Sequence, residues 1–255
     1  MPNHPHRHTI VFSNQKGGVG KTTLTREIGI YLASAGTKTL LVDIDPQANL
    51  SRSLADNLDN GLFEALTGGG YEAREIFPSL YLLCGNIRLA SLEKSLIGEL
   101  DAYIRLREFM AEPIFQEFEY ILIDSPPSLG VLTINALTAA DHLVIPMNPA
   151  LYSLQGTNDL MGTIAKVKKN LNPNLSIAGV IINAFDQVPV ITREIRQEIV
   201  SSFGDRVFRT VLSKSIKIEE AIAGRHGVVT LTKAKVKDEV VQIGEELIDR
   251  LEGVR

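Results

Sequence analysis

An apolar stretch, a glycine-rich octet and an apolar-periodic segment follow one another near the start of this 255-residue chain. They cover residues 9–12, 16–23 and 24–32, and the octet reads Lys-Gly-Gly-Val-Gly-Lys-Thr-Thr. A strand, a glycine loop and a helix in this order form the setting of a phosphate-binding loop, because glycines let successive N–H groups turn toward one anion. The start of the helix adds partial positive charge at the same place. This feature therefore favours an α/β fold.

The octet predicts which groups hold a nucleotide. We expect the side chain of Lys21 to reach the β- and γ-phosphates and the hydroxyl of Thr22 to hold Mg²⁺. The loop backbone contributes its N–H groups to the same anion. The expected nucleotide-binding residues of the loop are Gly17, Gly18, Val19, Gly20, Lys21, Thr22 and Thr23.

The octet departs from the ordinary pattern G-x-x-x-x-G-K-[ST]. Gln15 stands where that pattern has its first glycine, and a second lysine, Lys16, follows it. Because one loop seldom needs two lysines for its own nucleotide, we expect Lys16 to point toward a nucleotide held by another subunit. The alternative is that Lys16 is a solvated loop lysine.

Two further motifs follow in order, Val-Asp-Ile-Asp-Pro-Gln-Ala-Asn at residues 42–49 and Ile-Leu-Ile-Asp-Ser-Pro-Pro-Ser at residues 121–128. Together the three motifs resemble the ParA ATPases, which belong to the larger ParA/MinD group with a deviant Walker A loop. The resemblance extends from residue 9 to about residue 231. It implies a slow ATPase that uses ATP and Mg²⁺, forms a homodimer across ATP, and is stimulated by a ParB-like or adaptor protein.

The resemblance also implies a cellular role. An ATP-bound dimer would bind DNA nonspecifically and position or segregate a cargo, which can be a plasmid, a chromosome or a protein assembly. The expected location is the cytoplasm, in association with the nucleoid. The sequence does not identify the cargo or the stimulating partner.

Three aspartates close predicted strands and complete the chemical set. Asp43 and Asp45 lie 22 and 24 residues after Lys21. A carboxylate opposite the γ-phosphate can position the attacking water, and the resemblance assigns this role to Asp45, with Lys16 and Lys21 as the other catalytic residues. We expect Asp124 to hold the magnesium shell and Asp43 to lie on the metal side of the site. The alternative is that one of the two, Asp43 or Asp45, only caps the following turn.

An asparagine closes another predicted strand, at residues 177–183. The side-chain amide of Asn183 carries both a donor and an acceptor, so at this position it can read the edge of an adenine base. The resemblance supports this nucleotide-binding role. The alternative is an asparagine that only stabilises the turn after the strand.

Apolar strand-like runs alternate with helical segments along the chain, as in a doubly wound, mostly parallel sheet with helices on both faces. We expect one P-loop NTPase domain over residues 9–255 after a disordered head at residues 1–8. The stretch 50–79 has weak strand character and is expected to hold short surface helices. The expected strands are 9–13, 39–43, 81–84, 120–124, 142–146, 177–183 and a short one at 207–212. The expected helices are 21–35, 89–96, 101–115, 132–139, 153–170, 192–203 and 236–251.

Composition excludes several classes of protein. The one cysteine, Cys84, excludes a disulfide framework, a Cys-x-x-Cys metal site and a cysteine-ligated iron–sulfur cluster within the chain. No apolar run approaches the ~18 residues of a membrane span. The alternating His4, His6 and His8 make a metal site conceivable, although a frayed polar head is the expectation.

The net charge of −4 argues against a uniformly basic nucleic-acid binder. Residues 193–237 nevertheless carry ten Lys or Arg and five Asp or Glu, so either a polyanion-binding face or an ordinary solvated surface lies there. At positions where ParA relatives carry two DNA-binding arginines and a glutamate, this chain has Lys214, Val188 and Ala150. The candidate DNA-binding residues are Arg193, Arg196, Arg209, Lys214, Lys217, Arg225, Lys233 and Lys235.

Two other functions stay open. One is a non-catalytic interaction protein in which ATP is a structural staple, and the retained Asp45 argues against it. The other is a MinD-like, membrane-associated positioning ATPase. Residues 236–255 argue against the membrane, because they carry six acids, three bases and no Phe or Trp, so an anionic leaflet would repel them.

Overall fold

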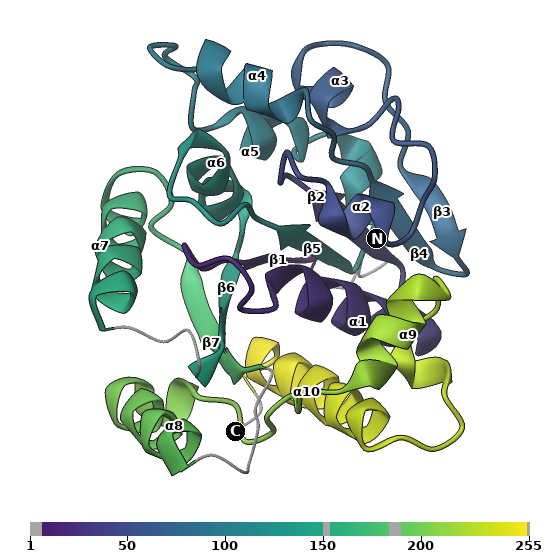
Figure 1. Ribbon diagram of the computed structural model, residues 1–255. Helices are drawn as coiled ribbons and strands as arrows, with labels where there is room; N and C mark the ends of the chain where they lie inside the picture. Colours follow the sequence, from purple (N-terminus) through teal and green to yellow (C-terminus); the bar gives the residue numbers. More distant parts are fainter. Residues whose placement is uncertain (1–6, 150–153, 184–189, 254–255) are drawn as a thin grey trace.

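A computed structural model describes residues 7–149, 154–183 and 190–253. In this part of the chain a seven-stranded sheet has the strand order β3-β4-β2-β5-β1-β6-β7 (Figure 1). Neighbouring strands are parallel, except that β3 is antiparallel to β4. The strands are β1 (His8–Phe12), β2 (Thr39–Asp43), β3 (Arg74–Phe77), β4 (Leu80–Leu83), β5 (Tyr120–Asp124), β6 (His142–Met147) and β7 (Ser176–Ile182).

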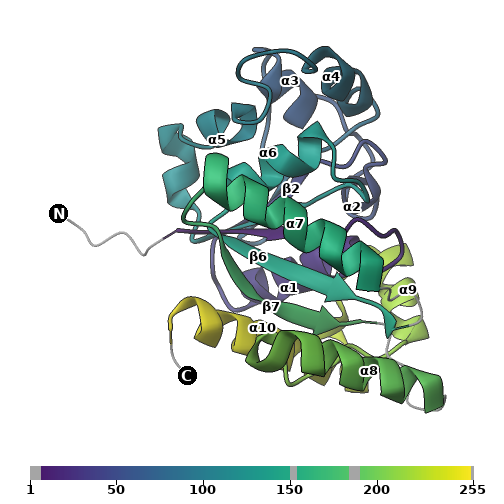
Figure 2. The ribbon, with the colours of Figure 1, turned by 90° about the vertical axis from the view of Figure 1, so that its left-hand side faces the viewer.

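Helices cover both faces of the sheet (Figures 1 and 2). Buried residues of α1 and α10 pack on one face, and those of α4, α5, α6 and α7 pack on the other. The α-helices are α1 (Lys21–Ser34), α2 (Asn49–Arg52), α3 (Leu62–Leu66), α4 (Leu89–Ser95), α5 (Arg105–Phe109), α6 (Val131–Ala139), α7 (Leu154–Asn170), α8 (Val190–Phe203), α9 (Ile216–Ala223) and α10 (Lys235–Leu251). Short 3-10 helices are η1 (Pro113–Glu117), η3 (Gly204–Arg206) and η4 (Val228–Thr230).

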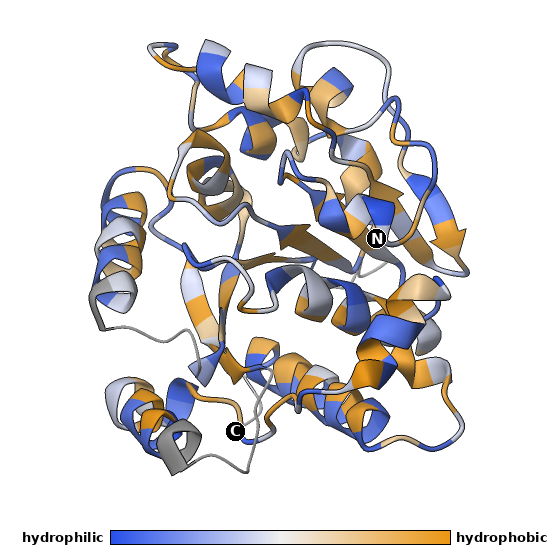
Figure 3. Ribbon diagram, viewed as in Figure 1, coloured by the Kyte–Doolittle hydropathy of each residue, from blue (hydrophilic) through white to orange (hydrophobic). Residues whose placement is uncertain are grey.

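The central strand β1 shows how the sequence divides between the two layers. Ile10 and Phe12 pack toward α1 and α10, whereas Val11 packs into the opposite layer, and all three are fully buried. A strand that is buried on both faces is apolar throughout, because successive side chains point to opposite sides. Figure 3 shows the resulting apolar centre of the molecule, with hydrophilic residues gathered on the outer faces of the helices.

The predicted fold class is confirmed, since the sheet is mostly parallel and helices lie on both faces. The register of the strands brings the sequence motifs together at one edge. Phe12, the last residue of β1, and Asp43, the last residue of β2, are both paired with Asp124 at the end of β5. The carboxyl edge of the sheet is where ligands bind in folds of this type.

Some predicted elements were wrong. Residues 207–212 form no strand but only a single bridge between Val207 and Val180. The N–H groups of Phe208 and Leu212 donate to the carbonyls of Val180 and Ile182 at 2.9 Å each, so four residues of this segment span two of β7 and the regular strand register is lost. The predicted helix at 101–115 is divided into α5 and η1, since Pro113 has no N–H to continue the helix. The short strand β3 and the helix α9 were not predicted.

Candidate functional site

The glycine-rich octet forms a tight loop between β1 and α1. Gly18 and Gly20 have φ angles of 73° and 92°, in the left-handed region that favours glycine. Gly20 is the last residue before α1, so the loop delivers the chain directly to a helix N-terminus. A Cβ atom on Gly20 would lie 1.8 Å from Nδ2 of Asn183, so no other residue fits there without displacing that side chain. Backbone N–H groups at such a turn form an anion-binding concavity.

Two asparagines at strand ends hold this loop. Asn14 donates from Nδ2 to the carbonyl of Pro146, 2.8 Å away, and its Oδ1 accepts a hydrogen bond from the N–H of Lys16 at 3.1 Å. Asn183 donates from Nδ2 to the carbonyl of Val19 at 3.0 Å. The structure therefore gives the Asn183 amide a contact with the loop, and its role in reading adenine stays a prediction. Asn14 was not predicted from the sequence. The one feature that could have indicated it is its position, as a polar residue two places after the end of the buried strand β1.

Lys21, which the octet predicts to contact the phosphates, is buried in the loop. Lys21 donates from Nζ to the carbonyl of Lys16 at 3.1 Å, and its side chain lies near the carboxylates of Asp124 and Asp45. Burial lowers the pKa of Lys21, while the two carboxylates act in the opposite direction. The loop thus brings one buried lysine between the acids of two other motifs.

Thr22 and Asp124 form the pair expected for a magnesium site. The Thr22 hydroxyl donates to Oδ2 of Asp124 at 2.6 Å. The other oxygen of Asp124, Oδ1, is buried and has no hydrogen-bond partner in the described part of the chain. Burial, and then the neighbouring charge of Asp43, raises the pKa of Asp124 well above its ordinary value. A buried carboxylate oxygen without a partner is costly in isolation, so these oxygen ligands fit a hard cation such as Mg²⁺.

The described residues contain no group of three or more His, Cys, Asp or Glu side chains arranged to hold a metal ion. A cation at Thr22 and Asp124 would therefore take its remaining ligands from water and from phosphate oxygens. This is the usual arrangement for magnesium in nucleotide sites, because Mg²⁺ keeps several waters and binds few carboxylates.

Asp43 holds the segment that follows β2. Its Oδ2 accepts hydrogen bonds from the N–H and the hydroxyl of Ser51, at 2.8 and 2.7 Å, and its Oδ1 accepts one from the N–H of Asp45 at 3.1 Å. Burial raises the pKa of Asp43 to about 6 although these donors act to lower it. The N–H of Gly85 in turn donates to Ser51 Oγ at 2.9 Å. Ser51, in α2, carried no sequence signal, because its partners are Asp43 at the end of β2 and Gly85 after the end of β4.

Asp45 lies in the turn directly after this anchor. Its Oδ1 accepts a hydrogen bond from the N–H of Gln47 at 2.9 Å, and its carbonyl accepts one from the N–H of Ala48 at 2.9 Å. The residue is 6% exposed and acts electrostatically on Lys21. The structure therefore brings Lys21, Thr22, Asp43, Asp45 and Asp124 together, with Lys16 on the same loop.

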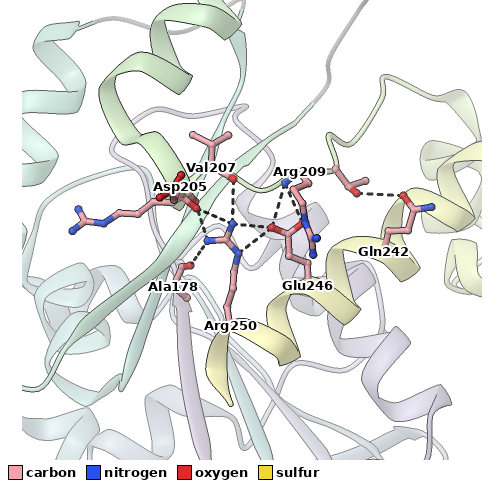
Figure 4. A network of polar contacts seen from close by, with 9 residues as sticks. Ala178, Asp205, Val207, Arg209, Gln242, Glu246 and Arg250 are labelled. Atoms are coloured by element: carbon pink, nitrogen blue, oxygen red, sulfur yellow. Dashed lines mark hydrogen bonds and ion pairs between the residues drawn. The ribbon is translucent and has the colours of Figure 1, made fainter. Parts of the chain in front are cut away.

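The candidate DNA-binding residues lie in a different part of the molecule, and several are paired with acids. Figure 4 shows Arg209 beside Glu246, which also binds Arg250, while Arg250 donates to the carbonyls of Ala178 and Val207 at 3.1 Å each. The ion pairs among the candidates are Arg209–Glu246, Lys217–Glu220, Arg225–Asp56 and Lys235–Glu239.

Three other candidates, Arg196, Lys214 and Lys233, make no ion pair within residues 7–149, 154–183 and 190–253. The backbone of Arg193 belongs to α8, but its side chain lies outside the described part, as do Val188 and Ala150. Within the described residues, no helix is both long and apolar enough to span a bilayer.

The fold and the loop define a P-loop nucleotide-binding protein. A family model described as an AAA domain matches residues 7–177. The chain is 38% identical to the chromosome-partitioning ATPase Soj of Treponema pallidum over 217 aligned residues. The aligned region covers 84% of this chain and 85% of that protein. It is 35% identical over 249 residues to the chromosome partitioning protein ParA of Myxococcus xanthus, covering 94% and 88%. The chain therefore belongs to the ParA family of partition ATPases.

Solved structures show the same architecture. The cobyrinic acid a,c-diamide synthase of Mycobacterium smegmatis, solved with a bound ATP analog and magnesium, superposes with a TM-score of 0.84 at 27% identity and covers 98% of this chain and 97% of that chain. Similar folds thus serve different reactions, so the function of this chain must be argued from its own residues.

Proposed function

We propose that this protein is a ParA-type ATPase that binds ATP and Mg²⁺, dimerises across the nucleotide, and in that state binds DNA nonspecifically to position or segregate a cargo. The observation that carries the proposal is the convergence of Lys21, Thr22, Asp45 and Asp124 on a loop at a helix N-terminus. The buried oxygen of Asp124 without a partner in the described residues adds a place for the cation. The binding of an ATP analog and magnesium by the M. smegmatis structure supports the choice of ligand.

The residues divide the chemistry between binding and positioning. The loop N–H groups and Lys21 bind the phosphates, and Thr22 and Asp124 hold the cation, which would neutralise charge that develops on the transferred phosphoryl group. Asp45 accepts a hydrogen bond from the attacking water and orients it. Asp43 keeps Asp45 in place through its bond to the Asp45 N–H. Because phosphoryl transfer depends on positioning and charge, we expect slow hydrolysis without a further cation from outside.

Lys16 supplies the link between subunits in this proposal. Lys21 already fills the interior of the loop and bonds to the carbonyl of Lys16, so a second lysine is not needed for the loop's own phosphates. Lys16 would instead reach the nucleotide bound by a second copy of the chain. ATP would then bind more tightly to the dimer than to the monomer, and this difference in affinity would stabilise the dimer. Stimulation by a ParB-like partner and association with the nucleoid complete the proposal.

Gel filtration with light scattering tests the switch. The parent protein is expected to dimerise with ATP and not with ADP or without nucleotide, and the Asp45→Ala variant is expected to stay dimeric with ATP for longer. Lys16→Ala is expected to stay monomeric with ATP. Lys38→Ala is the matched control, because Lys38 pairs with Glu117 near the start of β2, at the opposite edge of the sheet. Dimerisation of Lys16→Ala equal to that of the parent contradicts the proposal.

The hydrolysis rate separates the enzyme from its alternative. We expect Asp45→Ala to bind ATP and to hydrolyse it more slowly than the parent protein. Equal rates in the two proteins would favour a non-catalytic protein that uses ATP only as a staple.

A further inference from the structure

The turn between α9 and η4 is fastened to the helix that begins at the nucleotide loop. Arg26 of α1 is fully buried and donates from Nη2 to the carbonyl of His226 at 3.0 Å and toward that of Ala221 at 3.5 Å. Its neighbour Glu27 accepts a hydrogen bond from the N–H of Val228 at 2.8 Å. The turn and α1 therefore form one rigid unit.

Arg225 occupies this turn in an uncommon backbone conformation. Its φ angle is 53°, in the left-handed region that residues other than glycine seldom adopt. Such strain persists only where the surroundings impose it, and it is concentrated at functional sites. Here the bonds from α1 on both sides of the turn impose it. A Cβ atom on Gly227 would lie 2.5 Å from Cγ2 of Ile30, which shows how closely the turn approaches α1.

The consequence is that the guanidinium of Arg225 reaches Asp56. Nη1 donates to Oδ2 of Asp56 at 2.6 Å, and Nη2 bonds to Oδ1, so the pair is bidentate. Both side chains face solvent, with 45% of the arginine and 82% of the aspartate exposed. An Arg guanidinium matches a phosphate group with the same two-pronged geometry that it uses for a carboxylate.

Asp56 belongs to the segment that carries the water-positioning aspartate. This segment leaves β2 at Asp43 and passes through Asp45, and Ser51 is bonded to Asp43. The N–H of Ala55, the residue before Asp56, donates to the carbonyl of Ser51 at 2.8 Å. A movement of this segment on nucleotide binding would therefore act directly on Asp56.

We propose that Arg225 is a phosphate-binding residue of the DNA surface that its ion pair with Asp56 masks, and that rearrangement of the 45–56 segment on ATP binding releases it. This proposal rests on the proposed function. The pair is exposed, so its strength is modest, and a DNA phosphate can replace the carboxylate. The ion pairs Lys217–Glu220 and Lys235–Glu239 differ, because each joins residues within one helix and touches no part of the 45–56 segment.

The test measures affinity for mixed-sequence duplex DNA by fluorescence anisotropy at several salt concentrations, with ATP and without nucleotide. Without nucleotide, Asp56→Asn is expected to raise affinity by about twofold to fivefold. The slope of log K against log salt should steepen by about one unit, as for one added phosphate contact. With ATP, Asp56→Asn should equal the parent protein. The double variant Asp56→Asn with Arg225→Gln should show no gain.

Glu220→Gln is the matched control. It frees Lys217 from its partner in the same helix, so it should change affinity equally with and without ATP. By linkage, Asp56→Asn should also reduce the factor by which DNA changes ATP affinity, measured with a fluorescent ATP analogue.

Two negative results are distinguishable. If the parent protein does not bind DNA with ATP, the proposed function fails and this inference fails with it. If the parent binds DNA with ATP but Asp56→Asn without nucleotide matches the parent in affinity and salt slope, the inference alone is overturned. A gain in Asp56→Asn that persists in the double variant also overturns it, because the gain then does not come from Arg225.

Discussion

The buried ion pair on α1 permits a sharp prediction about stability. Arg26 and Glu27 are both fully buried and contact each other. Burial raises the pKa of Glu27, and the charge of Arg26 acts against this rise. Glu27→Ala would leave a guanidinium in the core without its carboxylate, and arginine cannot lose its proton to escape the cost.

The expected magnitude follows from this burial. Removing one partner of a buried ion pair costs about 3–5 kcal/mol, most of it from the uncompensated charge. In a chain of this length that corresponds to a fall in Tm on the order of 10 °C. The N–H of Val228 also loses its acceptor, which adds to the cost.

A double variant separates the charge from the contacts. Arg26→Met with Glu27→Gln removes both charges, keeps similar volume and leaves an acceptor for the Val228 N–H. The carbonyl of His226 loses its donor, so we expect a net cost of about 1–3 kcal/mol, less than that of Glu27→Ala alone.

Urea unfolding of the nucleotide-free protein, followed by circular dichroism and by tyrosine fluorescence, measures these free energies when the two probes give coincident transitions. A cost for Glu27→Ala within about 1 kcal/mol of zero, or a double variant that costs more than Glu27→Ala, would refute the assignment of Arg26 as a buried cation that depends on Glu27.

Three further predictions concern the site and the opposite edge of the sheet. Gly20→Ala should abolish measurable ATP-analogue binding, because the added Cβ would lie 1.8 Å from Nδ2 of Asn183 at a φ of 92°; binding like that of the parent in a fluorescence titration would contradict this. Ser51→Ala should lower the free energy of unfolding by about 1–3 kcal/mol, because the buried Asp43 carboxylate and the Gly85 N–H each lose a partner; unchanged urea midpoints would argue against it. Burial lowers the pKa of His142, so its folded-state pKa lies below the unfolded value of about 6.5. The stability that this residue contributes is therefore present above pH 6.5 and is lost as pH falls through the folded-state pKa, and His142→Gln should flatten the pH dependence of Tm in that window.

The phosphate-binding loop could be predicted from the sequence because all its determinants are local. Glycine spacing, a buried strand before it and a helix after it occur within a short stretch of chain. The strands that end in Asp43 and Asp124 could be predicted for the same reason, since apolar runs followed by an acid are visible without knowing their neighbours. Topology rules then placed these ends at one edge of the sheet.

The supporting contacts could not be predicted, because they join residues far apart in sequence. Asn14 reaches a carbonyl 132 positions away, and Asn183 reaches one 164 positions away. Nothing in the periodicity of either segment specifies the partner. The same limit explains the error at 207–212, where the chain bonds to β7 only at Val180 and Ile182 and the N–H of Arg209 between these points donates to the carboxylate of Glu246 on α10.

The basic surface shows why charge counted along a stretch of sequence is a poor guide to charge in the fold. Residues 193–237 have an excess of Lys and Arg, yet Arg209, Arg225 and Lys235 are paired with acids that lie outside that range. Two of those acids, Glu239 and Glu246, belong to α10. From the sequence alone, the acids of this segment serve only as an argument against membrane binding. DNA binding through Arg209, Arg225 or Lys235 would therefore require its ion pair within the chain to open, and the contribution of each would depend on how easily that pair opens rather than on the net charge of the region. The pair between Arg225 and Asp56 differs from the other two because its acid belongs to the segment that follows β2 and is bonded to Asp43 through Ser51. For this reason we propose it, and not the other two, as the pair whose opening ATP controls.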